Sequence, residues 1–171
     1  MATASRPLTK EEFRSLYGGK KPYFEYWFGE AIQKSMPTWL HSVLQRILGD
    51  LLVKAGYKSG SEVELRIDPD WEPVPDVIGT SRPITGRYPT EPVEVVIEIL
   101  SPEDPMSHML EKCSHYSRIG ILATFVVDPD KKIAWFWNAK SEKLERVRSL
   151  ELPNGNQVDL AEAFAELDKQ S

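Results

Sequence analysis

The sequence predicts an α/β domain in which helices flank a mixed central sheet. Three observations predict this class. Apolar residues recur every three or four positions over 40–52, which is typical of an amphipathic helix. From Tyr57 the period changes to two, which is typical of a strand with one solvated face. Further on, a helical segment over 106–119 lies between two apolar runs, which indicates a crossover between parallel strands.

The length and composition set the broad class of protein. A chain of 171 residues favours one domain, residues 1–171, with a short N-terminal helix over 8–17 as an extension. Its single cysteine, Cys113, excludes a disulfide framework. The N-terminus lacks the apolar core of a signal peptide, and no stretch approaches the ~18 apolar residues of a membrane span. We therefore expect a cytoplasmic protein with no membrane partner.

The charge balance bears on partners. The formal net charge is -5, so the chain has no general electrostatic attraction to nucleic acid. This weighs against a tight, non-specific DNA binder. It leaves open an enzyme that meets phosphate through a bound cation and a local basic rim.

The first third of the chain predicts a helix, a hairpin and a longer helix. Residues 9–12 have the pattern of a capping box, and the short helix that follows should end at Gly18. Residues 23–28, which are rich in aromatic side chains, and residues 31–35 flank Gly29-Glu30, and this arrangement predicts a hairpin. Thr38 is expected to cap the main helix, which should end near Gly56.

The remaining elements are mostly strands. Alternating apolar and charged residues predict a strand over 57–67 with one solvated face. Shorter or more apolar runs predict further strands over 73–79, 93–100 and 122–127. Residues 132–138 should pair back as an edge hairpin, and residues 143–150 are expected to add a strand. Asp159 has the position of an N-cap for a last helix over 160–167.

The stretch over 93–116 contains the most unusual charge. Glu98 lies inside an apolar strand, where a carboxylate is costly unless a charged group pairs with it. His108, Lys112 and Tyr116 follow at intervals of four residues, so they share one face of a helix. Either Lys112 or a metal ion is the expected partner of Glu98.

A second carboxylate, Asp76, stands at the start of the preceding strand. If the two strands are neighbours, Asp76 and Glu98 point to one position and repel each other unless a divalent cation lies between them. Mg²⁺, with Mn²⁺ as the alternative, suits such a site because it takes few protein carboxylates, keeps waters and binds substrate phosphate. A lysine nearby would orient the attacking water or stabilise developing negative charge.

Several short motifs occur in a fixed order. Pro75-Asp76 is followed by Glu-Ile-Leu-Ser-Pro from Glu98, then by Lys112 with Tyr116 four residues later, then by Val-Val-Asp-Pro over 126–129. Upstream, residues 25–30 read E-x3-G-E, and His41 opens the main helix. This set, which covers roughly residues 23–137, resembles the Uma-two family of restriction endonucleases within the PD-(D/E)XK nuclease superfamily.

The resemblance implies a restriction-endonuclease-like core and a metal-dependent endonuclease with DNA as its substrate. It implies Asp76 and Glu98 as metal ligands and Lys112 as the catalytic lysine. In the wider superfamily this lysine stands two residues after the glutamate, a position that is Leu100 here. Lys112 is similar to the lysine that the Uma-two pattern carries on the helix.

Three further residues are expected to support the site: Glu30, His41 and Tyr116. Plainer roles stay open for all three, since Tyr116 could only pack its ring, and His41 and Glu30 could be exposed residues outside the site. The chain also departs from the family pattern. His108 stands where relatives often carry an acidic residue, and residues 121–125 replace the usual V-P-E-Y-W.

Two other interpretations remain open. One is a binding or assembly module that keeps the nuclease fold without catalysis, in which a Glu98–Lys112 ion pair excludes metal. The other is a structural homo-oligomer, such as a homodimer, in which the aromatic hairpin around residues 135–137 forms the interface.

Overall fold

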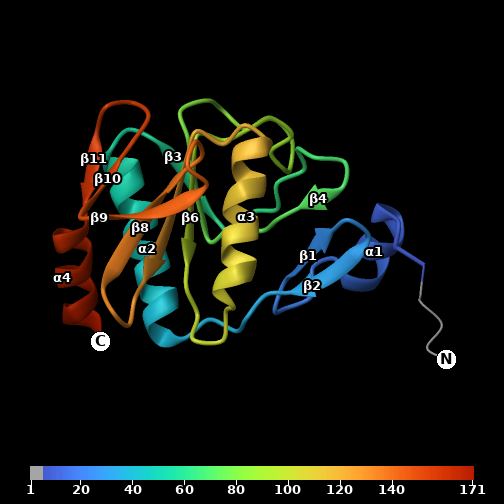
Figure 1. Cartoon of the computed structure of the whole chain (residues 1–171), viewed down its shortest axis with the longest axis horizontal. Coiled ribbons are helices and arrows are strands. Elements are labelled where there is room, and N and C mark those ends of the chain that lie inside the picture. The colour runs from blue at the N-terminus through green and yellow to red at the C-terminus, as the bar shows by residue number, and fades with distance from the viewer. Residues whose placement is uncertain (1–5) are drawn as a thin grey trace.

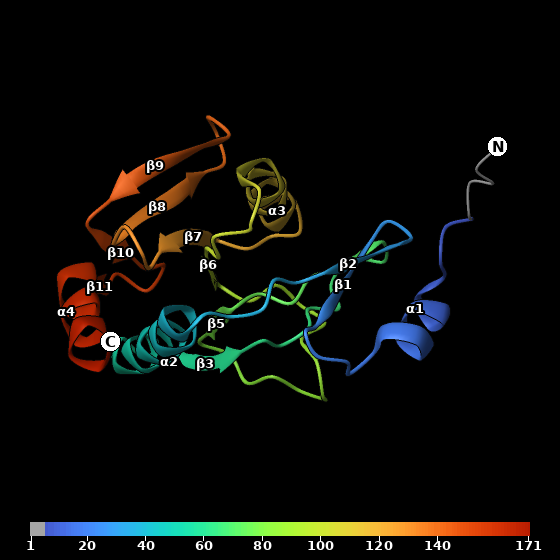
Figure 2. The same ribbon diagram turned by 90° about the horizontal axis from the view of Figure 1, so that it is seen from below.

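The computed structural model describes residues 6–171 and contains a six-stranded mixed sheet with helices on both faces (Figures 1 and 2). The helices are α1 (Lys10–Tyr17), α2 (Trp39–Lys54), α3 (Met106–Arg118) and α4 (Leu160–Gln170). The strands are β1 (Phe24–Trp27), β2 (Glu30–Gln33), β3 (Lys58–Ser61), β4 (Trp71–Glu72), β5 (Val77–Thr80), β6 (Val95–Ile99), β7 (Ala123–Asp128), β8 (Ile133–Asn138), β9 (Lys143–Val147), β10 (Ser149–Glu151) and β11 (Gln157–Asp159).

The large sheet has the strand order β3-β5-β6-β7-β8-β9. Strands β6 and β7 are parallel and are joined by α3, whereas the other neighbours in this sheet are antiparallel. The predicted crossover and mixed sheet are therefore confirmed. Strands β2, β1 and β4 form a smaller sheet, which lies beside the large one and next to α1 (Figure 2).

Alternation along β6 divides the interior into two sides. Val95, Ile97 and Ile99 join the main core, which they share with residues of α2 and α4. Val96 and Glu98 point to the other side, where Tyr116 of α3 lies. Because side chains of a strand alternate between faces, the position of Glu98 in the run of apolar residues decides that it faces α3.

Helix α2 begins and ends as the sequence predicts. The hydroxyl of Thr38 accepts a hydrogen bond from the backbone N–H of His41, which satisfies one free donor of the first turn. The apolar stripe of α2 is buried against the sheet through residues that include Leu44, Leu48 and Leu52. The predicted caps of α1 and α4 are also confirmed, with Thr9 and Asp159 as their N-caps.

The N-terminal hairpin turns one residue earlier than the sequence predicted. Trp27 pairs with Glu30, so the loop consists of Phe28 and Gly29, and both have positive φ (48° and 90°). Two-residue hairpin turns with positive φ match the twist of the flanking strands, and glycine adopts such values without strain. A Cβ on Gly29 would also meet Pro7 at 2.4 Å.

The predicted strand over 57–67 is wrong in its second half. Strand β3 ends at Ser61, because Glu62 has a φ of +54° and turns the chain out of the ladder. Beyond it, Leu65 donates its N–H to Pro73 and Arg66 donates to Pro89, so this segment is bonded to loops. Its alternating pattern reflects burial of Leu65 beside Trp71 in the second core cluster, not membership of the sheet.

The C-terminal region follows the prediction and adds one hairpin. Strand β8 pairs back on β7 as the expected hairpin, and β9 adds the expected further strand at the edge of the large sheet. The unpredicted pair β10–β11 leads into α4, which packs beside α2 (Figure 1). Among residues 6–171, none of the helices is long and apolar enough to span a membrane.

Leu48→Ala is expected to lower the free energy of unfolding by about 2–5 kcal/mol, because Leu48 is fully buried and its loss leaves a cavity between α2 and the sheet. Urea denaturation measures this change. The matched control is Val53→Ala on the same helix, at a position 56% exposed, which should change stability by about 0.5 kcal/mol or less. Equal effects of the two substitutions would contradict the assigned core.

Candidate active site

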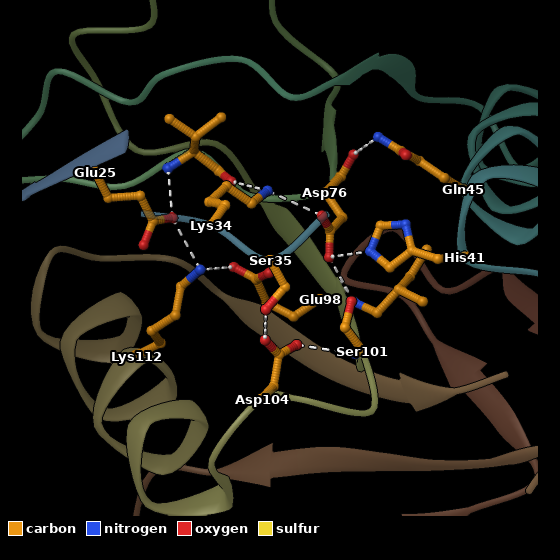
Figure 3. Close-up of polar contacts among 12 residues, drawn as sticks. Glu25, Lys34, Ser35, His41, Gln45, Asp76, Glu98, Ser101, Asp104 and Lys112 are labelled. Atoms are coloured by element: carbon orange, nitrogen blue, oxygen red, sulfur yellow. Dashed lines mark hydrogen bonds and ion pairs between the residues drawn. The ribbon is translucent and has the colours of Figure 1, made fainter. Parts of the chain in front are cut away.

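Charged side chains from four parts of the chain meet in one buried cluster (Figure 3). They come from the N-terminal hairpin, the start of β5, the end of β6 and helix α3. The cluster consists of Glu25, Lys34, Asp76, Glu98 and Lys112, all of which line a cavity of about 60 Å³. A cavity of this size has room for a few waters or an ion, but not for a nucleotide.

Strand pairing brings the two carboxylates together. Strands β5 and β6 are antiparallel, and Val77 pairs with Ile97. Continuing this register by one residue places Asp76 opposite Glu98. Residues opposite each other in antiparallel strands have Cβ atoms about 4.5–5.5 Å apart. Both side chains point to the α3 side of the sheet, so their carboxylates share one position.

Asp76 is held from several directions. Its Oδ1 lies 2.9 Å from Lys34 Nζ, and its Oδ2 accepts the backbone N–H of Ile99 at 2.7 Å. His41 Nε2 lies 3.3 Å from Oδ2, and Gln45 donates to the backbone carbonyl of Asp76 at 2.9 Å. Burial opposes ionisation, but Lys34, His41 and the Ile99 amide outweigh it, so the pKa of Asp76 lies well below its ordinary value.

Glu98 has a different environment from Asp76. Its Oε1 lies 2.8 Å from Lys112 Nζ and accepts the hydroxyl of Tyr116 at 2.5 Å. No donor among residues 6–171 reaches its Oε2. Burial raises the pKa of Glu98 to about 7, since desolvation and the neighbouring Asp76 outweigh the attraction of Lys112. The Glu98 carboxylate is therefore costly to ionise, and its Oε2 accepts no hydrogen bond from these residues.

Lys112 joins Glu98 to Glu25 of β1. Its Nζ lies 2.9 Å from Glu25 Oε1, which also accepts the backbone N–H of Val74 at 2.9 Å. The other oxygen of Glu25 accepts the indole N–H of Trp27 at 3.1 Å. Burial opposes ionisation of Glu25, but Lys112, Lys34 and the Val74 amide outweigh it and lower its pKa. Burial likewise opposes the charge of Lys112, but both carboxylates raise its pKa above the ordinary value.

The structure brings together five of the six site residues expected from the sequence. Asp76, Glu98, Lys112 and His41 line the cavity, and Tyr116 contacts Glu98 from beneath it. Both His41 and Tyr116 are buried, and their polar atoms reach the two carboxylates. His108 packs on the ring of Trp27, with ring centroids 4.5 Å apart, and also lines the cavity.

Glu30 is not brought into the cluster. It is exposed at the first position of β2, directly after the hairpin turn, and it does not line the cavity. Glu25 reaches the cluster instead. A signal for Glu25 was present, because it lies among aromatic residues of a short strand, as Glu98 lies among aliphatic ones. The sequence analysis did not identify Lys34 either. Lys34 follows an exposed residue at the end of β2, and its neighbours in the sequence do not indicate a buried charge.

The carboxylates of the cluster are the side chains that could hold a metal ion. Among residues 6–171, no three His, Cys, Asp or Glu side chains are arranged to hold a metal. Asp76 and Glu98 could supply two carboxylate donors, and no donor among these residues reaches Oε2 of Glu98. When all three carboxylates are ionised, both lysines are charged and His41 is neutral, the cluster carries one excess negative charge. These features fit one Mg²⁺ or Mn²⁺ ion, which needs only one or two protein carboxylates.

Lys112→Met is expected to lower the free energy of unfolding by about 3–5 kcal/mol, because it leaves Glu25 and Glu98 buried without their shared cation. Urea denaturation at pH 8 provides the measurement. Arg118→Met, an exposed position on the same helix, should have an effect of about 0.5 kcal/mol or less. A Lys112→Met protein as stable as wild type would contradict this arrangement.

The pKa of Glu98 predicts a pH-dependent difference between wild type and Glu98→Gln in the presence of chelator. Folding raises this pKa from 4.5 to about 7, so the stabilisation by the bound proton is complete at low pH and is lost as pH rises through about 7. Glu98→Gln cannot ionise. The difference between the unfolding free energies of Glu98→Gln and wild type (variant minus wild type) should therefore rise by roughly 3 kcal/mol between pH 4.5 and 8.

The pH series uses denaturant unfolding of both proteins, with Glu103→Gln as the exposed control. The control difference should stay constant with pH. A constant difference for Glu98→Gln as well would show that Glu98 does not carry a raised pKa in the folded protein.

Two solved structures resemble this chain to different degrees. A crystal structure described as "a putative nuclease belonging to DUF820 from Anabaena variabilis" matches with a TM-score of 0.77 and 23% sequence identity, over 94% of this chain and 99% of that one. The match shows that the two proteins share a restriction-endonuclease-like fold. The cryo-EM structure of a DrdV–DNA complex matches with a TM-score of only 0.40 and 18% identity, over 73% of this chain and 10% of that one.

The search of curated proteins gave no significant match. The sequence profile described as "Uma2: Putative restriction endonuclease" matches residues 10–168. This match includes every residue of the charged cluster and nearly the full length of the chain. The chain therefore belongs to the Uma2 family.

Proposed function

We propose that this protein is a Mg²⁺-dependent endonuclease that hydrolyses phosphodiester bonds in DNA. One observation carries the proposal: Asp76 and Glu98 stand opposite each other on neighbouring strands, with two lysine ammonium groups beside them. The description of the Uma2 family and the fold shared with the DUF820 protein support it. In this proposal Asp76 and Glu98 hold the cation.

A cation held there would polarise a phosphoryl oxygen and lower the pKa of a bound water. The side chains around it have separable roles. Ile99 N–H and His41 fix Asp76 through its Oδ2. Lys112 and Tyr116 fix Glu98 through Oε1, and no donor among residues 6–171 occupies Oε2. Lys112 also supplies positive charge where negative charge develops on the phosphate.

The small cavity limits how DNA would approach. At about 60 Å³ it cannot enclose a nucleotide, so the scissile phosphate would meet the site at its mouth. The loops after β2 and after β6 both line the cavity, and each contributes an exposed lining residue, Pro37 and Pro105. Ser35 Oγ donates to Asp104 Oδ1 at 2.7 Å and connects the two loops. The phosphate would thus meet segments that also position the charged cluster.

A second candidate is a nuclease-fold module that binds partners without catalysis. One observation favours it. Burial opposes protonation of His41, but Asp76 outweighs it and raises the His41 pKa. With His41 protonated, three cations balance three carboxylates, and the cluster is neutral without a metal. The Lys112–Glu98 contact at 2.8 Å is the ion pair that this candidate requires.

The nuclease proposal predicts that wild-type protein nicks supercoiled plasmid DNA in Mg²⁺ or Mn²⁺ and stops in excess chelator. Asp76→Asn and Glu98→Gln should each lower the rate by at least about 100-fold, because each removes a charged ligand of the cation. Glu94→Gln, just before β6 and outside the cavity, is the matched control and should keep the wild-type rate. Circular dichroism checks that each variant is folded. Nicking at full rate in Glu98→Gln or in chelator would refute the mechanism.

Calorimetric titration with MgCl₂ separates the two candidates without DNA. The nuclease proposal predicts measurable binding to wild type, and loss of that heat in Asp76→Asn, which removes the charge of one ligand. The non-catalytic candidate predicts no binding heat for either protein, because lysine and histidine already neutralise the carboxylates. Absence of both Mg²⁺ binding and nicking would decide in favour of the second candidate.

A further inference from the structure

Lys34 is the one cation of the charged cluster to which the proposed reaction gives no role. It directly follows β2, and its backbone N–H donates to the carbonyl of Tyr23 at 2.8 Å, which extends the β1–β2 ladder. The hairpin therefore fixes the backbone of Lys34. Its side chain extends into the cavity, where Nζ donates to Val74 O at 2.7 Å and to Asp76 Oδ1 at 2.9 Å (Figure 3).

The two lysines of the cluster are held differently. Lys112 Nζ lies between two carboxylates, and its side chain is 5% exposed. Lys34 Nζ contacts one carboxylate and one neutral carbonyl, and its side chain is 14% exposed. Gln33 and Pro37, on either side of Lys34 in the sequence, line the cavity and are exposed. Lys34 is thus the less constrained ammonium, and it is the one flanked by exposed lining residues.

The oxygens of Asp76 show what must change when a cation binds. Oδ2 faces the amide of Ile99, which the backbone of β6 fixes in place. Oδ1 faces Lys34, whose flexible four-carbon stem can move. A divalent cation at Asp76 would compete with the ammonium for Oδ1, and the two positive charges repel each other. Of the two oxygens, Oδ1 is therefore the one that can be released.

We propose that Lys34 is an exchanging cation: it pairs with Asp76 in the metal-free protein and contacts the scissile phosphate once a metal has taken its place. This inference rests on the proposed nuclease function. An ammonium group has three N–H donors and binds phosphate oxygens as a point charge. Lys34 would act as a catalytic residue that binds phosphate, in addition to Lys112, which also holds Glu98 and Glu25.

The test compares Lys34→Met and Lys34→Arg with Lys20→Met, an exposed lysine outside the cavity. Calorimetry with MgCl₂ alone measures the competition at Asp76. Lys34→Met should bind Mg²⁺ about tenfold more tightly than wild type, because a competing positive charge is gone. Plasmid nicking should slow by at least about 100-fold in the same variant, and Lys34→Arg should recover part of the rate. Lys20→Met should match wild type in both assays.

Two results would overturn the inference. If Lys34→Met binds Mg²⁺ no more tightly than wild type, Lys34 does not compete with the cation. If it binds Mg²⁺ more tightly but nicks at the wild-type rate, Lys34 is only a counter-ion of Asp76. Lys34→Gln, which keeps a hydrogen-bond donor without charge, takes the place of Lys34→Met if that protein does not fold.

A wild type that never nicks DNA would refute the proposed function separately. The phosphate contact is then measured by fluorescence anisotropy of a labelled 20-base-pair duplex in MgCl₂. Weaker binding by Lys34→Met than by Lys20→Met is the expected result. Equal affinity of these two variants for the duplex would overturn the phosphate contact. Whether Lys34 competes with Mg²⁺ at Asp76 is decided by the calorimetry.

Discussion

The shared contact of one ammonium with two carboxylates is the constraint on which the rest of the site depends. Lys112 extends from α3 and lies between Glu25 of the N-terminal hairpin and Glu98 of the large sheet. Buried ion pairs add little net stability over well-packed apolar residues, but losing one partner is strongly destabilising. The contact therefore fixes how three separate elements meet, and the cavity lies where they meet.

The two carboxylates that share Lys112 are not equivalent. Both oxygens of Glu25 accept hydrogen bonds, from Val74, Lys112 and Trp27. Within residues 6–171, no donor reaches one oxygen of Glu98, and Asp76 lies opposite Glu98, just before β5. This asymmetry favours a cation between Asp76 and Glu98 and not beside Glu25. It also explains why Glu25 serves to orient Lys112 and the hairpin.

The sequence alone predicted much of the fold. Caps and periodicity gave the bounds of α2 and α4 to within about three residues, because local hydrogen bonds decide where helices begin and end. The pattern failed over 62–67, where a positive φ at Glu62 removed the chain from the ladder. Apolar and polar residues also alternate in an extended loop that packs every second side chain against the core. Periodicity therefore cannot distinguish such a loop from a strand of the sheet.

The sequence also determined the chemical character of the site. A carboxylate inside an apolar strand must meet a cation, and Lys112 and Tyr116 lie on the helix face that returns over that strand. Only the tertiary structure decided which other charges join them. Glu25 and Lys34 lie on a hairpin about 40–90 residues away along the chain, and their contacts depend on how that hairpin docks against the sheet. Docking is set by the sum of many packing contacts, none of which leaves a local signal in the sequence.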